Sequence, residues 1–195
     1  MFTGIIETKG IIKNIFLKGS NKTFEIESDI TNELRVDQSI AHNGICLTVE
    51  KINEKIYTVT AIEETLLKTT AYLWQINDTI NLERCLLANS RIDGHFVQGH
   101  VDTTAICIAK KDNNGSWLFT FEFDKKFAAL VIEKGSVCVN GISLTCFNVT
   151  NNSFDVAIIP FTYTHTNIGK IAIDDKVNIE FDVLGKYINK FKSVE

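Results

Sequence analysis

Apolar and polar residues alternate in short runs along most of the chain, and these runs are rich in β-branched and aromatic side chains, which is typical of half-buried strands. Polar clusters such as Lys18-Gly19-Ser20-Asn21 separate the runs and predict turns. Short helices are expected at 30–34 and 127–132. The predicted strands cover residues 5–16, 22–28, 39–49, 55–62 and 79–84, and then residues 101–109, 117–123, 136–148, 154–159 and 176–181.

The predicted elements repeat along the chain at a fixed offset of 97 residues. Asn43-Gly44-Ile45-Cys46-Leu47-Thr48 returns as Asn140-Gly141-Ile142-Ser143-Leu144-Thr145, and each Asn-Gly pair favours a turn with positive φ. A repeat of this extent indicates two copies of one domain. Many short strands in so small a domain favour a closed barrel, because closure leaves no exposed strand edge. We therefore predict an all-β fold of two tandem barrels, at 1–90 and 91–184, with two similar cavities for two similar ligands.

The tail of the chain follows a different pattern. Leu184, Tyr187, Ile188 and Phe191 lie at helical spacing, and an isolated helix with so few apolar residues needs a partner surface. The spacing leaves two arrangements open: the helix packs on its own domain, or it joins subunits.

Composition and charge exclude several classes of function. The 195 residues carry a formal net charge of −4, and no basic block is longer than two residues, so a nucleic-acid partner is not expected. No apolar run is long enough for a membrane span, and the first residues do not resemble a signal peptide. The five cysteines show no CxxC spacing, which predicts neither a zinc ribbon nor a disulfide framework. A reducing cytoplasm is the expected setting.

Two of the four histidines follow a glycine at the start of the second copy. His95 and His100 are five residues apart on a predicted strand, so they are expected on opposite faces, and a metal site is not expected. The pattern favours a hydrogen bond from His95 to the backbone at the domain junction. For His100 the pattern leaves two roles open: a similar structural role, or proton transfer near neutral pH.

The repeated Asn-Gly runs contain the best candidates for chemistry. Cys46 and Thr48 share a strand face, as do Ser143 and Thr145. Such pairs can bind a polyhydroxylated ligand or assist proton transfer or nucleophilic attack, but they also suit strands, with Cys46 as a small buried apolar residue. The runs 63–65 and 160–162 are expected to end equivalent strands, either at a barrel mouth that binds ligands or as solvated turns.

Four segments carry a resemblance to a known family. They are Met1-Phe2-Thr3-Gly4-Ile5-Ile6, Ala41-His42-Asn43-Gly44-Ile45-Cys46-Leu47-Thr48, Gly94-His95-Phe96-Val97-Gln98-Gly99-His100-Val101-Asp102 and Asn140-Gly141-Ile142-Ser143-Leu144-Thr145. As a set, in this order and at this spacing, they resemble the riboflavin synthase alpha-chain family over essentially the whole chain.

The resemblance implies two six-stranded Greek-key barrels and a C-terminal helix at 185–195 that assembles a homotrimer. It implies dismutation of two 6,7-dimethyl-8-ribityllumazine molecules, one of which donates a four-carbon unit to the other, to give riboflavin and 5-amino-6-ribitylaminouracil. Neither a metal nor a redox cofactor is implied. The active site is expected between the N-terminal barrel of one subunit and the C-terminal barrel of the next. A complex with lumazine synthase stays open.

The matching motifs also imply site residues. Those of the N-terminal pocket are Gly4, Ile5, Ile6, Cys46, Leu47, Thr48, Thr60, Ala61, Ile62, Glu63, Glu64 and Thr65. Those of the C-terminal pocket are Gly99, His100, Val101, Lys134, Ser143, Leu144, Thr145, Ile158, Ile159, Pro160, Phe161, Thr162 and Tyr163. The residues expected to affect the rate are Phe2, Ser39, Cys46, His100, Ser143, Thr145 and Asp182. His100 and Thr145 are expected to transfer protons, Cys46 and Ser143 to assist addition to the ring or orient it, and Phe2 to shape the site.

Some positions depart from the family pattern, and two other functions compete. Asp93 stands where the family often has glycine, and Asn140, where some members have aspartate, cannot serve as a base. Tyr163 and His165 depart from the commoner leucine and charged residue. A non-catalytic lumazine or flavin antenna protein shares the repeat but tends to lose the reactive residues. A duplicated flavoprotein-reductase barrel would need a nicotinamide domain for which this chain has no room.

Overall fold

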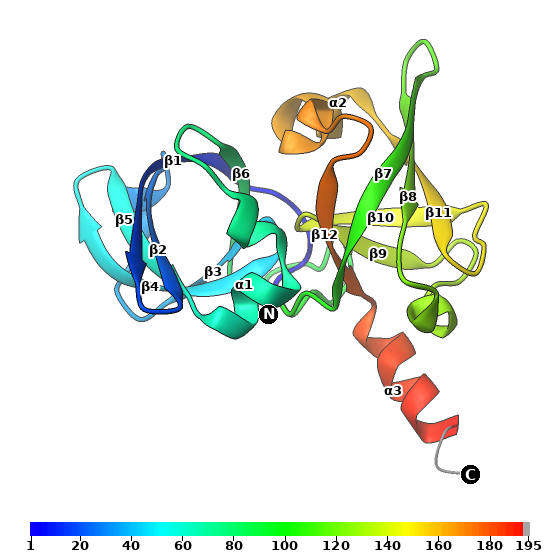
Figure 1. Cartoon of the computed structure of the whole chain (residues 1–195), viewed down its shortest axis with the longest axis horizontal. Helices are drawn as coiled ribbons and strands as arrows, with labels where there is room; N and C mark the ends of the chain where they lie inside the picture. Colours follow the sequence, from blue (N-terminus) through cyan, green and yellow to red (C-terminus); the bar gives the residue numbers. More distant parts are fainter. Residues whose placement is uncertain (193–195) are drawn as a thin grey trace.

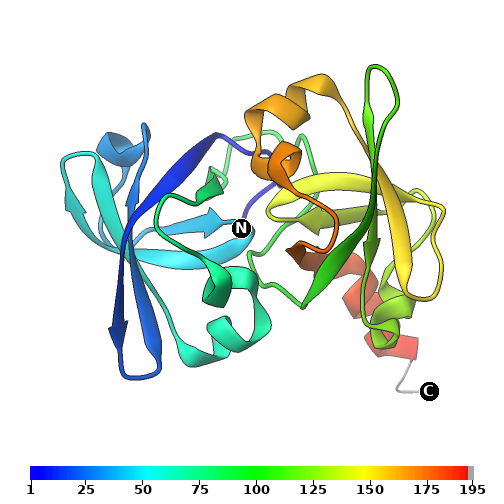
Figure 2. The ribbon, with the colours of Figure 1, turned by 45° about the horizontal axis from the view of Figure 1, so that its top comes forward.

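The computed structural model describes residues 1–192 and contains two closed, six-stranded antiparallel barrels that lie side by side (Figure 1, Figure 2). Barrel 1 consists of β1 (Thr8–Lys18), β2 (Asn21–Glu27), β3 (Ser39–His42), β4 (Ile45–Asn53), β5 (Ile56–Ala61) and β6 (Thr79–Arg84). Barrel 2 consists of β7 (Thr103–Asp112), β8 (Trp117–Glu122), β9 (Ser136–Val139), β10 (Ile142–Phe147), β11 (Ser153–Ile158) and β12 (Lys176–Phe181). The order β1-β2-β5-β4-β3-β6 around barrel 1 has its equivalent, β7-β8-β11-β10-β9-β12, in barrel 2. The predicted fold class is confirmed.

Each barrel encloses an apolar core of its own. Every second residue of β5 is buried, including Tyr57 and Val59, so the alternation in the sequence is also the inside–outside alternation of the strand. Phe119, Phe121 and Phe154 fill barrel 2 and are fully buried. Burial of one such side chain stabilises a fold by about 2–3 kcal/mol. These two separate cores make each copy of the repeat a packed unit.

The two long predicted strands that contain Asn-Gly are each a pair of strands. The backbone turns between β3 and β4 at Asn43 and Gly44, whose φ angles are 47° and 78°. Asn140 and Gly141, with φ of 46° and 83°, turn the backbone between β9 and β10. The preference of Asn-Gly for positive φ at both turn residues explains both breaks.

Short helices follow β5 and β11, where the sequence analysis expected only the ends of strands. The helices are α1 (Glu63–Lys68), η2 (Thr70–Leu73), α2 (Pro160–His165) and η4 (Asn167–Lys170). Runs 63–65 and 160–162 therefore begin helices. Pro160 occupies the start of α2, where its missing N–H costs no hydrogen bond. The two helices that were predicted are present as η1 (Thr31–Glu33) and η3 (Lys125–Leu130).

Residues 94–102, which lead into barrel 2, do not form the expected strand. Their one β-bridge joins Val97 to Phe2. The prediction that His95 and His100 lie on opposite faces of a strand is therefore wrong.

Buried amide side chains join the two barrels. The Asn81 side chain donates to the Asn140 carbonyl at 2.9 Å, and the equivalent Asn178 side chain donates to the Asn43 carbonyl at 2.9 Å. All four residues are buried, where an unpaired amide would be costly. The two Asn-Gly turns therefore meet at the junction, so the asparagines of this repeat serve barrel–barrel contact.

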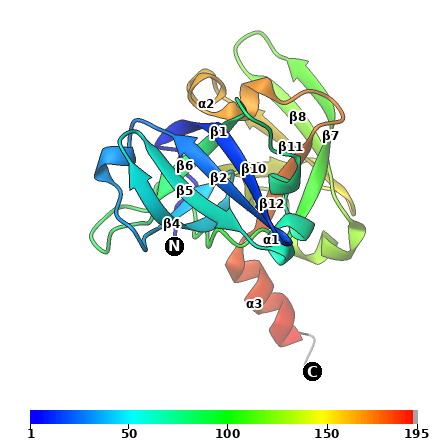
Figure 3. The same ribbon diagram turned by 60° about the vertical axis from the view of Figure 1, so that its left-hand side comes forward.

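α3 (Val183–Lys192) leaves barrel 2 as a protruding helix (Figure 1, Figure 3). Its apolar side chains stay exposed, with 58% for Leu184, 63% for Tyr187 and 73% for Phe191. The structure thus does not show the arrangement in which this stripe is buried on its own domain. Residues 193–195 of the predicted helix lie outside the described residues. No helix within residues 1–192 has the length and apolar character needed to cross a membrane.

Candidate active site

An extended arm precedes each barrel: the N-terminal arm, residues 2–6, and the linker arm, residues 97–101. The two arms are paired through two backbone hydrogen bonds of 2.7 and 3.1 Å between Phe2 and Val97. Beyond this point each arm runs along the barrel that it does not lead into. The arms are therefore exchanged between the two barrels.

Each arm meets the start of one strand of the opposite barrel. The N–H of Cys46 in β4 donates to the Gly99 carbonyl at 2.8 Å, and the N–H of Ser143 in β10 donates to the Gly4 carbonyl at 2.8 Å. Both glycines have positive φ, and a Cβ on either one would lie 2.6 Å from the Cβ of Cys46 or Ser143. Only glycine permits this approach. The repeat thus creates two equivalent contacts, one at the thiol and one at the hydroxyl.

The contacts of the arm residues differ from the expected grouping of these residues by barrel. Gly4 and Ile6 were expected in the N-terminal pocket, but Gly4 bonds to β10 and Ile6 packs against the core of barrel 2. Gly99 and Val101 were expected in the C-terminal pocket, but Gly99 bonds to β4 and Val101 packs against the core of barrel 1. Long-range backbone pairing decides this placement, and no local pattern encodes it. We define face A as Cys46, Thr48, Gly99 and Val101, and face B as Ser143, Thr145, Gly4 and Ile6.

Two equivalent carboxylates hold the arms in place. Glu83 accepts hydrogen bonds from the N–H groups of Thr3 and Gly4 at 2.6 and 2.9 Å. Glu180 accepts from three successive N–H groups, at 98–100, with distances of 2.6 to 2.9 Å. Burial raises the pKa of both carboxyls, while these hydrogen bonds oppose the shift. The sequence analysis assigned these glutamates no role, although their recurrence at the repeat offset is a signal that was present.

At face A the structure brings together three residues that were expected to affect the rate. Cys46 packs against the fully buried ring of Phe2, and a hydrogen bond links Cys46 to Ser39. Burial raises the pKa of the Cys46 thiol, and the bond to Ser39 only partly offsets this. The thiol is therefore neutral at neutral pH, and a neutral thiol is a weak nucleophile. This arrangement suits orientation of a ligand better than attack on it.

At face B the structure adds a residue that the sequence analysis set aside. The Nδ1 atom of His95 lies 2.7 Å from the hydroxyl oxygen of Ser143. His95 was expected to bond to the backbone with its side chain, but its backbone N–H makes that contact, to the Thr3 carbonyl at 3.1 Å. The contact joins residues 48 positions apart, so no local spacing could predict it. Its one signal in the sequence is the Gly94-His95 pair itself.

The two residues expected to transfer protons do not lie together. The side chains of His100 and Thr145 are exposed, and no hydrogen bond joins them in the described part of the chain. His100 directly follows Gly99, so its side chain starts beside face A, whereas Thr145 belongs to face B. The sequence analysis paired them because it assigned the linker arm to barrel 2.

A gap in the strand ladder lies beside face A. β4 begins at Ile45 and β5 continues to Ala61, but their pairing stops at Val49 and Val59. Two adjacent strand ends are therefore unpaired with each other, and α1 begins directly after one of them. The expected pocket residues on these ends and on α1 are Cys46, Leu47, Thr48, Thr60, Ala61, Ile62, Glu63, Glu64 and Thr65.

A matching gap lies beside face B. β10 begins at Ile142 and β11 continues to Ile158, but their pairing stops at Cys146 and Val156. The expected pocket residues here are Ser143, Leu144, Thr145, Ile158, Ile159, Pro160, Phe161, Thr162 and Tyr163. Both gaps combine unpaired backbone with apolar side chains, such as Ile62 and Ile159, which are exposed. A flat polar ring can bind to such a gap through its edge and its face.

Three other predicted positions lie around barrel 2. The Lys134 ammonium sits 5.2 Å from the centre of the Phe147 ring, at the end of β10 that pairs with β11. Asp182 accepts a hydrogen bond from the Leu184 N–H at 3.0 Å, so it caps α3, and it is close enough to His95 to influence its pKa. The Tyr163 ring stacks on Trp117 with ring centres 3.6 Å apart.

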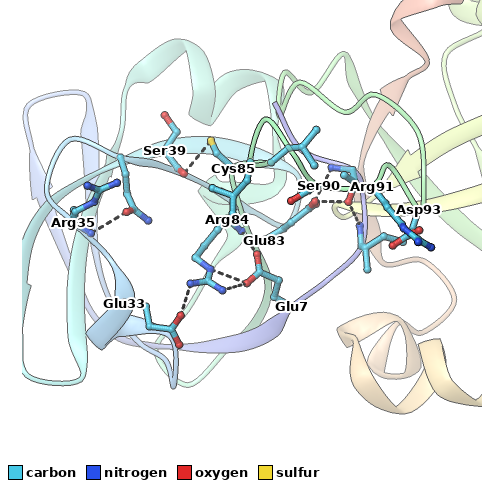
Figure 4. Close-up of a pocket in the computed structure, with 15 residues that line it drawn as sticks. Glu7, Glu33, Arg35, Ser39, Glu83, Arg84, Cys85, Ser90, Arg91 and Asp93 are labelled. Carbon is cyan, nitrogen blue, oxygen red and sulfur yellow. Dashed lines mark hydrogen bonds and ion pairs between the residues drawn. The ribbon is translucent and has the colours of Figure 1, made fainter.

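A cleft of about 1010 Å³ lies between barrel 1 and the chain that leaves it (Figure 4). Ser39 and Ile5 line it, so it adjoins the Cys46 thiol and the N-terminal arm. Arg84 crosses the cleft and forms ion pairs of 2.7 Å with Glu7 and 2.6 Å with Glu33. The cleft has the volume of a small-molecule site. Of the cleft residues named here, the sequence analysis predicted only Ser39 and Ile5.

Comparison with known proteins identifies the family. A model of the lumazine binding domain matches residues 3–85 and again residues 98–182. The chain is 38% identical to the riboflavin synthase of Actinobacillus pleuropneumoniae, over 98% of this chain and 89% of that protein. It is 36% identical to the riboflavin synthase of Schizosaccharomyces pombe, over 97% of this chain and 93% of that protein. The two domain matches correspond to the two barrels.

Solved structures show the same fold at lower identity. Crystal structures of LumP complexed with riboflavin and with 6,7-dimethyl-8-(1'-D-ribityl) lumazine superpose with TM-scores of 0.87 and 0.84. Each is 20% identical and covers 93% of this chain and 99% of that chain. The class defined by fold and domain is that of proteins with two lumazine-binding barrels. Within that class, the chain belongs to the riboflavin synthase family.

Proposed function

We propose that this protein is an enzyme that converts two molecules of 6,7-dimethyl-8-ribityllumazine into riboflavin and 5-amino-6-ribitylaminouracil. The observation that carries the proposal is the pair of equivalent faces, each built on a ladder gap and crossed by the arm of the other barrel. Two similar faces suit a reaction between two identical substrates. The relatives named riboflavin synthase, which match nearly the whole chain, support the same activity.

We propose that one lumazine ring binds in each gap. The N–H of Cys46 points away from β3, toward Gly99, and residues two apart in a strand direct their N–H groups the same way. The N–H of Thr48 is therefore directed toward the gap, and the same argument applies to Thr145 beyond Ser143. A pyrimidinedione edge carries the carbonyl acceptors that such groups bind, and the ribityl chain supplies hydroxyls for the neighbouring threonines.

The chemistry then requires orientation, proton transfer and stabilisation of anionic intermediates. Transfer of a four-carbon unit between two bound rings gains up to about 7–11 kcal/mol from orientation alone. His100, beside face A, and Thr145, on face B, are the proposed proton-transfer residues on the two sides. Cys46 orients the ring at face A as a neutral thiol, and Ser143 acts on the ring at face B.

We propose that the chain acts as a homotrimer in which face A of one subunit meets face B of the next. The exposed apolar stripe of α3, formed by Leu184, Tyr187, Ile188 and Phe191, supports this assembly. An unpartnered stripe on a single helix is stabilised when copies of the helix associate. A cytoplasmic setting and a complex with lumazine synthase stay predictions.

A lumazine-binding protein without turnover is the second candidate. The likeness in fold to LumP, whose structures hold riboflavin, lumazine or flavin mononucleotide, favours it. Such a protein needs binding residues alone, whereas here Cys46, His100, Ser143 and Thr145 are all present at the two faces. We therefore favour the enzyme.

The experiment that separates the two functions is a turnover assay. Purified, untagged protein is incubated with the lumazine, without added metal or nucleotide, and both lumazine and riboflavin are quantified by chromatography. One riboflavin formed for every two lumazines consumed would establish the enzyme. Tight lumazine binding without riboflavin formation would contradict it and favour the binding protein.

A further inference from the structure

The His95 side chain is held rigidly against Ser143. His95 is only 8% exposed, and its Nδ1 atom lies 2.7 Å from the Ser143 hydroxyl oxygen. The backbone on both sides fixes this contact, because the His95 N–H donates to the Thr3 carbonyl and the Ser143 N–H donates to the Gly4 carbonyl. The N-terminal arm thus sets the position of both partners.

The second ring nitrogen decides which partner is the donor. His95 Nε2 is buried and has no hydrogen-bond partner among residues 1–192. Burial lowers the pKa of His95, and the Asp182 carboxylate only partly opposes this, so the ring is neutral at neutral pH. A neutral ring carries one N–H, and a buried unpaired N–H is rarer in folded proteins than a buried unpaired acceptor. The hydrogen therefore lies on Nδ1, and His95 donates to the Ser143 oxygen.

This tautomer determines what Ser143 can do. A hydroxyl oxygen that accepts a hydrogen bond still has its own O–H to donate. The structure shows no other side-chain hydrogen bond for Ser143 in the described residues, and Ser143 lies on face B beside the ladder gap. Its O–H is therefore available to a molecule bound there.

We propose that His95 is a positioning residue: it holds Ser143 so that the Ser143 O–H donates to the negative charge that develops on the lumazine at face B. The inference rests on the proposed function. It makes Ser143 a donor and not a nucleophile. A fixed donor to developing charge typically contributes about 10²–10³ in kcat. Because this charge is absent from the bound substrate, the contact should change kcat and leave lumazine affinity unchanged.

Two amide substitutions form a matched pair. Asn at position 95 places an N–H where Nδ1 is, whereas Gln places its amide one bond farther, near Nε2. His95→Gln should lower kcat about 100-fold, and His95→Asn should stay within about fivefold of the wild type. The lumazine Kd, measured by fluorescence titration, should change by less than about twofold in both. If a buried glutamine prevents folding, His95→Met has similar reach without the N–H and takes its place.

A double-mutant cycle with Ser143→Ala separates positioning from general structural damage. Ser143→Ala should lower kcat about 100-fold, and adding His95→Gln should lower it no further, since His95 acts through Ser143. Additive losses in the double variant, or equal losses in His95→Asn and His95→Gln, would overturn the inference. A wild-type protein that binds lumazine without forming riboflavin would instead overturn the proposed function, and the inference with it.

Discussion

Barrel 1 contains a buried hydrogen bond that barrel 2 lacks. His42 Nε2 and the Tyr57 hydroxyl are 2.9 Å apart and fully buried. The residues 97 positions later are Val139 and Phe154, which are also fully buried but apolar. One barrel topology thus accepts either a polar pair or an apolar pair at the same place in its core.

Three polar positions at and beside the junction between the barrels did not diverge in this way. Asn43, Asn81 and Glu83 recur unchanged as Asn140, Asn178 and Glu180, and each pair makes equivalent hydrogen bonds. Asn81 and Asn178 must each fit their own barrel and the Asn-Gly turn of the other. Glu83 and Glu180 must each fit their own barrel and the arm that leads into it. The comparison teaches that these hydrogen-bonded positions are more constrained than the positions of His42 and Tyr57 in the core.

The faces differ where chemistry is proposed. Cys46 at face A corresponds to Ser143 at face B, and only Ser143 has a histidine partner. The arms also differ, because His100 follows Gly99 whereas Ile5 follows Gly4. The two faces can therefore bind the same ligand, while their different side chains give that ligand different roles in the reaction.

Removal of an arm-holding carboxylate should have the largest effect. Glu83→Ala and Glu180→Ala each leave at least two arm N–H groups without an acceptor, at about 1–3 kcal/mol per group. We expect a loss of about 3–5 kcal/mol in the free energy of unfolding for either variant. Urea unfolding with a constant m-value measures it. Glu50→Ala, at an exposed position, is the control. A large loss of unfolding free energy in only one of the two glutamate variants would show that the two arms are not equivalent.

Acid should destabilise barrel 1 more than barrel 2. Burial lowers the pKa of His42 from 6.5 to about 4. The unfolded chain therefore binds a proton in this range and the folded chain does not, so stability falls as pH drops from 6.5 to 4, by about 3 kcal/mol.

The test compares the wild type with His42→Val/Tyr57→Phe, which gives barrel 1 the residues of barrel 2. Glu83 and Glu180 act alike in both proteins, so the difference in pH dependence isolates His42. Unfolding free energies between pH 4 and 7 should show a shallower slope for the variant. Identical slopes would mean that folding does not lower the pKa of His42.

Giving Cys46 and Ser143 each other's side chain should change kcat more at face B than at face A. Ser143→Cys replaces a good donor with a weak one and should lower kcat about tenfold. Cys46→Ser should change kcat less than about threefold, because the neutral thiol orients the ring and a hydroxyl fits the same space. Steady-state kinetics measures both. A larger loss for Cys46→Ser would point to a thiolate at face A.

The helix α3 follows barrel 2 and has no equivalent after barrel 1. Substitutions on this helix should have the smallest effect on the free energy of unfolding. Tyr187→Glu/Phe191→Glu places charges on the exposed stripe. It should dissociate the trimer in sedimentation experiments, while the free energy of unfolding per chain at low concentration changes by less than about 0.5 kcal/mol. Asn189→Gln, at an exposed position on the same helix, is the comparison. An unchanged sedimentation coefficient would exclude α3 as the subunit contact.

The sequence predicts the features that depend on local pattern or on repetition. Alternation located the strands, the offset located the second barrel, and the Asn-Gly pairs located two turns whose φ angles are positive. The six-residue helices α1 and α2 were missed because so short a segment has no clear helical period. Pro160 at the first position of α2 and the acidic pair that opens α1 were their signals.

The features that the sequence does not predict depend on long-range pairing. The arm exchange joins Phe2 to Val97 and Gly4 to Ser143 through backbone atoms, which leave no side-chain pattern. Without that exchange, Gly99 was grouped with barrel 2 alone and His95 was separated from Ser143. Motifs in the sequence identified the candidate site residues, but only the fold shows which of them lie together.

The most direct test of two ligand-binding faces is the number of lumazine sites per chain. Ser143→Ala, in which turnover should be slow, is titrated with lumazine by equilibrium dialysis. We predict two sites per chain, and one remaining site when Thr48→Trp or Thr145→Trp fills one of the gaps. A single site in Ser143→Ala, or no loss of a site in either tryptophan variant, would contradict the account.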